Sequence, residues 1–159
     1  MKKKLLLAIL CLCVFSHTAH AQVKTEAAKS PKAVLAAYIE AWNQHDYAAF
    51  DTLLAPDGVH EDIAEGFHGQ GAEQVKNFMR DVLKAEPDYV WKTTSVIESG
   101  NTVVAEWTWT ATYTGDSPIG QLTGKHITGR GACVAVIKDG RIQRVTDYYD
   151  NASFFPKNQ

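Results

Sequence analysis

The side chain best placed for chemistry lies on the last predicted strand, residues 141–150. Successive residues of a strand point to opposite faces, so Val145, Asp147 and Tyr149 share one side of it. On the concave side of a curved sheet, Asp147 would lie among Trp107, Trp109 and Cys133. Apolar walls disfavour the charged carboxylate and raise its pKa, which suits a group that exchanges a proton next to a carbonyl. The same pattern also fits a structural carboxylate bonded to the backbone or to a tyrosine hydroxyl.

A second polar group follows from a short predicted strand, residues 59–63. Alternation places His60 and Asp62 on one face, at the mouth of the same cavity, and turns Glu61 away from it. We therefore expect Asp147, His60 and Asp62 to be the catalytic residues, with His60 as a polar residue of the rim. Neighbouring residues that point to opposite faces do not make a metal site, and the chain has no glycine-rich phosphate loop and no CxxC motif. The prediction is a site without metal or cofactor.

Helical periodicity is concentrated in the first part of the chain after residue 30. Ser30 and Pro31 are typical of a helix start, and apolar residues then recur at helical spacing as far as Trp42. Asp46 can cap a second short helix. The composition of the next segments predicts a turn at residues 55–58, a glycine-rich loop at residues 66–71 and a third helix at residues 72–84.

Beyond Pro87 the apolar period changes from helical to two, which indicates long strands. Those predicted are residues 89–98, 102–113, 125–138 and 141–150, with tight turns at residues 99–101 and 139–140. Helices followed by a meander indicate an α+β fold, with about three N-terminal helices packed on one face of a curved antiparallel or mixed sheet. A strongly curved sheet closed at one end by helices encloses a cavity of the kind that binds small molecules.

Four stretches resemble the SnoaL-like family of the nuclear transport factor 2-like superfamily. They are residues 38–46 (YIEAWNQHD), 66–69 (GFHG), 138–142 (KDGRI) and 147–150 (DYYD). The resemblance extends from about Pro31 to Phe155 and implies a conical α+β barrel. The superfamily includes polyketide cyclases, ketosteroid isomerases, limonene-epoxide hydrolases, dehydratases and non-catalytic binding or dimerisation domains, so the fold alone leaves the activity open.

The resemblance implies a role for Asp147, because cyclases and epoxide hydrolases both have an aspartate on the last strand that projects into the cone. The arginine and aspartate of the epoxide hydrolases on the middle strand correspond here to Trp107 and Trp109. Their tyrosine and asparagine correspond to His60 and Asp62, so epoxide hydrolysis by that mechanism is not expected. We expect a small hydrophobic ligand to contact Tyr38, Trp42, Phe67, Trp107, Trp109, Cys133 and Tyr149.

Two classes of function follow from these residues. The first is acid–base catalysis of the isomerase, cyclase or hydrolase type, with Asp147 as the reacting carboxyl group and His60 or Asp62 as its partner. The second is a non-catalytic exported module that binds a ligand or dimerises, since no second catalytic group matches a known branch of the superfamily.

The chain begins with an export signal. Three lysines precede an uncharged run from Leu5 to Phe15, and an Ala-x-Ala pattern ends at Ala21. The run is shorter than the roughly 20 apolar residues that a membrane anchor needs, so no membrane association is expected after cleavage. We predict a periplasmic or secreted protein with cleavage before Gln22: a signal peptide at residues 1–21, a flexible leader at 22–30 and the SnoaL-like domain at 31–156.

Cleavage also changes the charge and the cysteine count. It would remove three lysines and no acidic residue, so the formal net charge of −2 becomes −5, which does not suit a nucleic-acid binder. Only Cys133 would remain, so no internal disulfide can form. The face of the long strands away from the helices predicts a homodimer, because it carries apolar and threonine side chains: Thr108, Thr110, Val134, Val136 and Tyr148.

Overall fold

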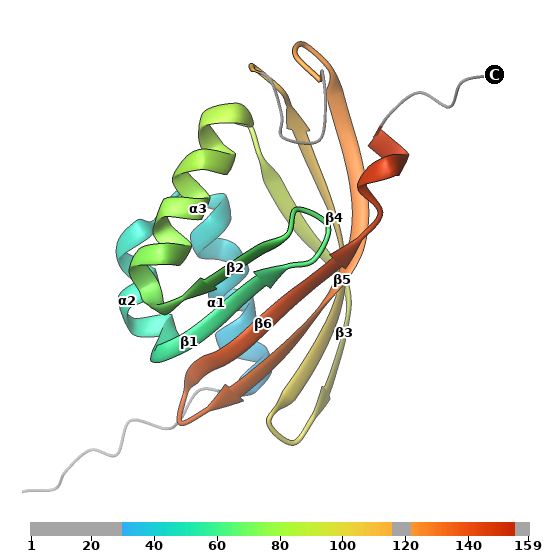
Figure 1. The fold of residues 1–159 in the computed structure, drawn as a ribbon. Helices are drawn as coiled ribbons and strands as arrows, with labels where there is room; N and C mark the ends of the chain where they lie inside the picture. Colours follow the sequence, from blue (N-terminus) through green and yellow to red (C-terminus); the bar gives the residue numbers. More distant parts are fainter. Residues whose placement is uncertain (1–29, 116–121, 155–159) are drawn as a thin grey trace, which may run out of the picture.

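The computed structural model describes residues 30–115 and 122–154 (Figure 1). Its helices are α1 (Pro31–Asn43), the short 3-10 helix η1 (Tyr47–Ala49), α2 (Phe50–Leu53), α3 (Gly71–Ala85) and a terminal 3-10 helix, η2 (Asn151–Phe154). Ser30 caps α1 as predicted, because its Oγ accepts a hydrogen bond from the amide of Ala33 at 3.3 Å, and Asp46 caps η1 in the same way. The predicted signal peptide and the leader up to Lys29 lie outside the described residues.

Six strands form one mixed sheet in the order β2-β1-β6-β5-β4-β3. They are β1 (Leu54–Asp62), β2 (Phe67–Gln70), β3 (Val90–Ser99), β4 (Thr102–Thr112), β5 (His126–Lys138) and β6 (Arg141–Tyr149). Every neighbouring pair is antiparallel except β1 and β6, which run parallel. The predicted α+β fold with a curved, mixed sheet is therefore confirmed.

β1 is longer than predicted, and the segment predicted as a glycine-rich loop contains the strand β2. Residues 55–58, predicted as a turn, belong to β1, and β2 lies within the predicted loop and pairs with β1. The register of β1 on β6 shifts between Leu54 and Val59, and this irregularity accommodates a proline inside a strand. A Cβ atom at Gly58 would lie 2.6 Å from the carbonyl oxygen of Ile142, so glycine permits this close approach of β1 to β6.

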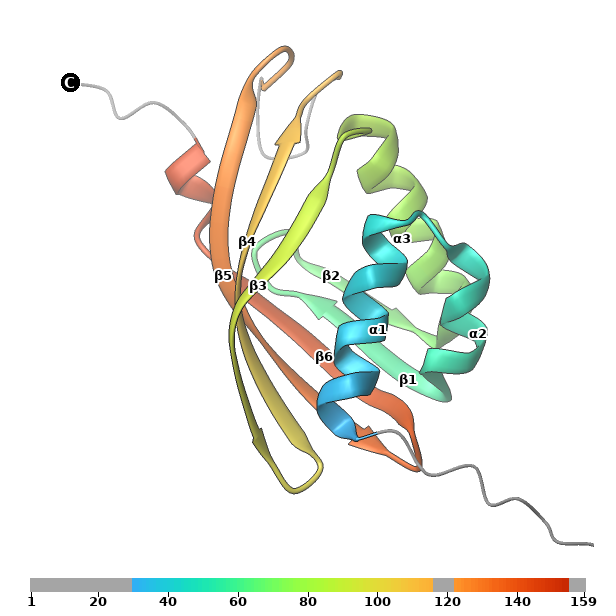
Figure 2. The same cartoon turned by 180° about the vertical axis from the view of Figure 1, so that it is seen from behind.

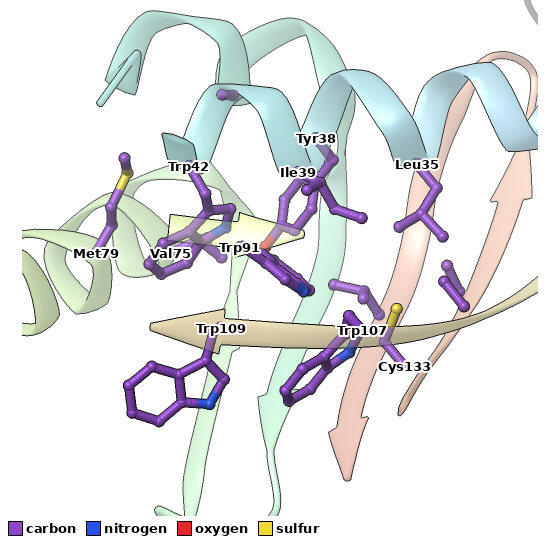
Figure 3. Packing of buried hydrophobic residues seen from close by; sticks show 14 of the residues in the cluster. Leu35, Tyr38, Ile39, Trp42, Val75, Met79, Trp91, Trp107, Trp109 and Cys133 are labelled. Carbon is purple, nitrogen blue, oxygen red and sulfur yellow. The ribbon is translucent and has the colours of Figure 1, made fainter. Parts of the chain in front are cut away.

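The helices α1, α2 and α3 lie on the concave side of the sheet, and β3, β4 and β5 curve around them (Figure 2). Along β4, every second residue from Val103 to Ala111 is buried, as the alternation predicted. Tyr38 and Trp42 extend from α1 toward the tryptophans of β3 and β4 (Figure 3). Within the described ranges, no helix is long and apolar enough to cross a membrane.

Candidate functional site

Three buried side chains form a hydrogen-bonded chain inside the cone: Tyr38 on α1, His60 on β1 and Asp147 on β6. The Oη of Tyr38 lies 2.9 Å from Nδ1 of His60, and Nε2 of His60 lies 2.9 Å from Oδ2 of Asp147. The parallel pairing sets Asp62 opposite Asp147 and His60 opposite Val145, so His60 and Asp147 are diagonal neighbours on the inner face. The pairing of β1 with β6 therefore builds the site.

The depth of His60 differs from the prediction of a polar rim residue. Its exposed fraction is only 2 %, and four aromatic rings pack edge-on against the imidazole. A histidine can lie this deep because both ring nitrogens have hydrogen-bond partners, which offset the cost of removing them from water. One partner, Tyr38, comes from α1, and a strand pattern around His60 gives no sign of it.

The chain of hydrogen bonds leaves one oxygen of Asp147 available. Burial is the largest cause that raises the pKa of Tyr38 well above its ordinary value, so the hydroxyl keeps its proton. It can donate to Nδ1 of His60, and the Nε2–H of the ring then donates to the carboxylate of Asp147. Oδ1 of Asp147 is buried and has no hydrogen-bond partner among the residues that the structure describes. This oxygen is suited to accepting a proton or a hydrogen bond from a ligand.

Asp147 lines an inner cavity of about 40 Å³. The cavity shares Glu65, Phe78, Val82 and Glu86 with a wider outer groove of about 350 Å³. The inner space admits water or one small chemical group, whereas the groove has the size of an ordinary small-molecule site. The wall of the inner cavity is mainly aromatic and acidic: Trp42, Asp62, Glu65, Glu86, Tyr89, Trp91, Trp107, Trp109, Asp147 and Tyr149.

Most of the predicted site residues meet in this inner cavity, namely Trp42, His60, Asp62, Trp107, Trp109, Asp147 and Tyr149. The other three lie around it. Tyr38 is behind His60, and Phe67 lines the outer groove and stacks on Phe78 with ring centroids 3.9 Å apart. Cys133 is opposite Asp147 in the sheet register and beside Trp107 (Figure 3), but it does not line the cavity; burial raises the pKa of its thiol to about 12.

Sequence reasoning missed two glutamates at the junction of the cavity and the groove. Glu65 lies in the turn between β1 and β2, and Glu86 directly follows α3. Burial is the largest cause that raises the pKa of each to about 7, and neighbouring carboxylates add to the effect. Burial also raises the pKa of Asp62, which accepts hydrogen bonds of 3.0 Å from the amide of Glu65 and the hydroxyl of Tyr149. A turn and a helix end carry no periodic pattern that could have identified them.

The site has no metal-binding arrangement in the described part of the chain. No three histidine, cysteine, aspartate or glutamate side chains there converge in a way that could hold a metal ion. The chemistry that these side chains offer directly is proton exchange at Asp147, hydrogen bonding, and contact with aromatic rings.

Solved structures share this fold. IdmH, a proposed polyketide cyclase from Streptomyces antibioticus, is 19% identical and matches with a TM-score of 0.70 over 79% of this chain and 96% of its own. A proposed polyketide cyclase from Acidithiobacillus ferrooxidans is 25% identical, with a TM-score of 0.67 over 80% and 93% of the two chains. A protein with a ketosteroid isomerase-like fold from Catenulispora acidiphila, solved in complex with trimethylamine, is 22% identical, with a TM-score of 0.67 over 76% and 88%.

The family follows from the sequence match rather than from these distant structures. No curated protein matches the chain. Residues 32–157 match the family model for SnoaL-like polyketide cyclases, a range that begins at the second residue of α1 and includes the six described strands and Asp147. This confirms the resemblance that the sequence motifs indicated, and the chain belongs to the SnoaL-like polyketide cyclase family.

Proposed function

We propose that this protein is an exported acid–base catalyst that acts on a small hydrophobic carbonyl compound. The observation that carries the proposal is the state of the Asp147 carboxyl group. One oxygen is held by His60, and the other is buried at the cavity wall with no hydrogen-bond partner in the described part of the chain. A carboxylate fixed by one oxygen and free at the other is positioned to exchange a proton with a bound ligand.

In the proposed reaction, Oδ1 of Asp147 takes a proton from the carbon next to a ligand carbonyl. The electron pair of the broken C–H bond forms a C=C bond and the carbonyl electrons move to oxygen, which gives an enolate. The buried indole N–H of Trp91, at the cavity wall and without a partner among the described residues, can donate to that oxygen. In a cyclisation, the enolate carbon then attacks a second carbonyl of the ligand, and Asp147 gives its proton to the alkoxide that forms. In an isomerisation, Asp147 instead returns the same proton to a different carbon of a conjugated enolate.

Deuterium exchange tests this proton transfer without knowledge of the natural substrate. Proton NMR of phenylacetone in D2O would report exchange at the carbon next to the carbonyl. We expect wild type to accelerate the exchange above buffer and Asp147→Asn to slow the protein-dependent rate by about 100-fold or more. Asp57→Asn, an exposed substitution on β1, is the matched control and should leave the rate unchanged. Equal rates for wild type and Asp147→Asn would exclude Asp147 as the base.

The alternative function is a non-catalytic binding module, and the volumes of the inner cavity and the outer groove support it. A ligand larger than one small group would lie mainly in the outer groove of about 350 Å³, away from Asp147. Mass spectrometry of small molecules that co-purify with protein from its native compartment separates the two functions. One unaltered ligand supports binding, whereas a mixture of substrate and product supports catalysis.

The proposed location outside the cytoplasm rests on the first residues. A lysine-rich start, an uncharged run and the Ala19–Ala21 motif are typical of a cleavable signal peptide. N-terminal sequencing of protein recovered from the periplasm or the medium should begin at Gln22. An intact N-terminus in the cytoplasmic fraction would contradict export.

We also propose that two copies pair through the outer face of the sheet. Thr108, Thr110, Val134 and Val136 are partly buried there, and Tyr148 is 50 % exposed. A self-complementary face of this kind can form a two-fold dimer. Analytical ultracentrifugation at tens of micromolar should show a dimer that Tyr148→Glu weakens, while a monomer under these conditions would exclude it.

A further inference from the structure

The inner cavity has an unusual balance of charge. Four carboxyl groups line it, those of Asp62, Glu65, Glu86 and Asp147. Among the described residues that line it, the only basic side chain is His60, and that imidazole is already bonded to Asp147. No lysine or arginine is among the lining residues. A ligand that enters this space therefore meets an excess of negative charge.

The geometry shows that this excess is not balanced within the cavity. Glu86 is only 5 % exposed, and Asp62 is buried with its oxygens bonded to Tyr149 and to an amide. The side chain of Asp147 is 7 % exposed, and its Oδ1 has no partner in the described residues. Burial and mutual repulsion raise the pKa of Glu65 and Glu86, as expected when carboxyl groups gather without a cation.

Aromatic rings surround the same carboxyl groups. Tyr89 and Trp109 lie parallel with centroids 5.8 Å apart, and Trp107 packs edge-on against Tyr149 at 5.8 Å. All four line the cavity. The face of an aromatic ring attracts a cation, most strongly for tryptophan, and the attraction grows when the cation is removed from water. Rings and carboxylates together are the chemistry that binds ammonium groups.

We propose that the ligand of this cavity carries a cationic nitrogen, an amine or a quaternary ammonium, held between Asp62, Glu65 and Glu86 and the neighbouring rings. This deepens the proposed function and rests on it in one respect, that the same cavity holds the ligand. The substrate class becomes a carbonyl compound that carries a cationic nitrogen.

The carboxyl groups also define where the two ends of the ligand lie. Glu65 and Glu86 line both the inner cavity and the outer groove, so the cationic nitrogen lies at their junction. The inner space of about 40 Å³ then receives the small carbonyl end, next to Asp147. An anionic ligand would be repelled by the same four groups, and a neutral ligand would leave their charge unbalanced.

Cation binding should strengthen with pH. The cation favours ionised carboxylates, so its affinity should rise as Glu65 and Glu86 lose their protons around pH 7. The titratable groups that face this junction come from β1, β6 and the segments around α3 and β4: His60, Asp62, Asp81, Tyr89, Tyr113, Asp147 and Tyr149. Burial raises the pKa of Tyr89 and Tyr149 further above the ordinary value of a tyrosine, so both phenols stay protonated between pH 5.5 and 8.5, the range in which Glu65 and Glu86 titrate.

A matched pair of probes tests the charge alone. Para-(hydroxymethyl)phenyltrimethylammonium and para-tert-butylbenzyl alcohol have the same shape and differ in one atom, a cationic nitrogen or a carbon. Quenching of tryptophan fluorescence would report their binding to the full mature chain. We expect the cation to bind about tenfold more tightly at pH 8.5, and this preference to fall about tenfold at pH 5.5. Equal affinities at pH 8.5, or no saturable binding of the cation, would overturn the proposal.

Variants identify the groups that carry the preference. Glu65→Gln and Glu86→Gln should each weaken cation binding about tenfold and leave the neutral probe unchanged. Glu106→Gln removes the same charge from an exposed position on β4 and is the control. A preference that survives both cavity substitutions would refute this site.

The two proposals fail in different experiments. Asp147→Asn should keep most of the cation preference while it loses deuterium exchange. Cation binding without any exchange in wild type would remove the catalytic proposal alone. Exchange in wild type without cation preference would remove this inference alone.

Discussion

Glu86 allows the cost of the buried carboxyl groups to be measured as folding stability. Its pKa in the folded chain is about 7, against an ordinary value of 4.5, with burial as the main cause. Between these two values the folded chain binds more protons than the unfolded chain, so stability falls as the pH rises. The penalty is small at pH 5, grows through pH 7 and is constant above it.

The size of the effect follows from the difference in pKa. Each pKa unit corresponds to about 1.4 kcal/mol, so Glu86 destabilises the fold by about 3 kcal/mol at pH 8 and by less than about 1 kcal/mol at pH 5. Glutamine cannot ionise and occupies nearly the same volume. We therefore predict that Glu86→Gln is more stable than wild type by about 2 to 3 kcal/mol at pH 8, or about 10 °C in Tm for a domain of this size.

Urea unfolding of wild type and Glu86→Gln at pH 5, 6, 7 and 8 would measure this difference. The gap between the two proteins should widen with pH, while Glu106→Gln, exposed on the outer face, should stay within about 0.5 kcal/mol of wild type at each pH. A Glu86→Gln curve parallel to wild type would refute the reasoning, because the carboxyl group would then ionise equally in both states. A less stable variant at pH 8 would show that the charged form is stabilised in the fold.

Three further predictions concern the polar chain and the core. Tyr38→Phe leaves Nδ1 of the buried His60 without its partner, so it should cost about 1 to 3 kcal/mol in urea unfolding and shift the pH profile of deuterium exchange. A Cβ atom at position 131 would lie 2.6 Å from the ring of Trp107, so Gly131→Ala should lower the Tm by several degrees and alter the near-ultraviolet circular dichroism. Cys133 should resist Ellman's reagent at pH 8 in the folded protein and react fully in urea, because its thiol is buried and its pKa is raised to about 12.

The parts of the fold that sequence reasoning predicted well depend on local patterns. The period of α1 and the alternation of β4 continue over ten or more residues, so each pattern identifies both the element and its buried face. The predicted start of β1 was wrong because Pro56 and Gly58 are residues typical of turns. Their place in a strand depends on β6, which lies far along the chain and pairs with Leu54 before them and with Val59 after them.

The residues of the candidate site likewise divide into those that a local sequence pattern predicts and those that it does not. Asp147 shares one face of its strand with Val145 and Tyr149, so its inward direction could be read from the sequence. The depth of His60 could not be read from the sequence, because its partner Tyr38 belongs to a helix, and no local pattern specifies how that helix packs on β1. Trp91 was missed because β3 contains a register shift and exposes most of its residues, which weakens its alternation.

Glu65 and Glu86 link the stability of the fold to the binding of a ligand. A domain that needed only to fold would gain stability from glutamine at position 86, where burial works against the carboxylate. A carboxyl group that costs stability is explained when a bound partner favours its charged form, because ligand binding then offsets the penalty. The same residue should therefore oppose folding without a ligand and favour binding of a cation. Saturating cation at pH 8 should raise the Tm of wild type more than that of Glu86→Gln, and an equal rise in both would separate the cost of burial from any role in recognition.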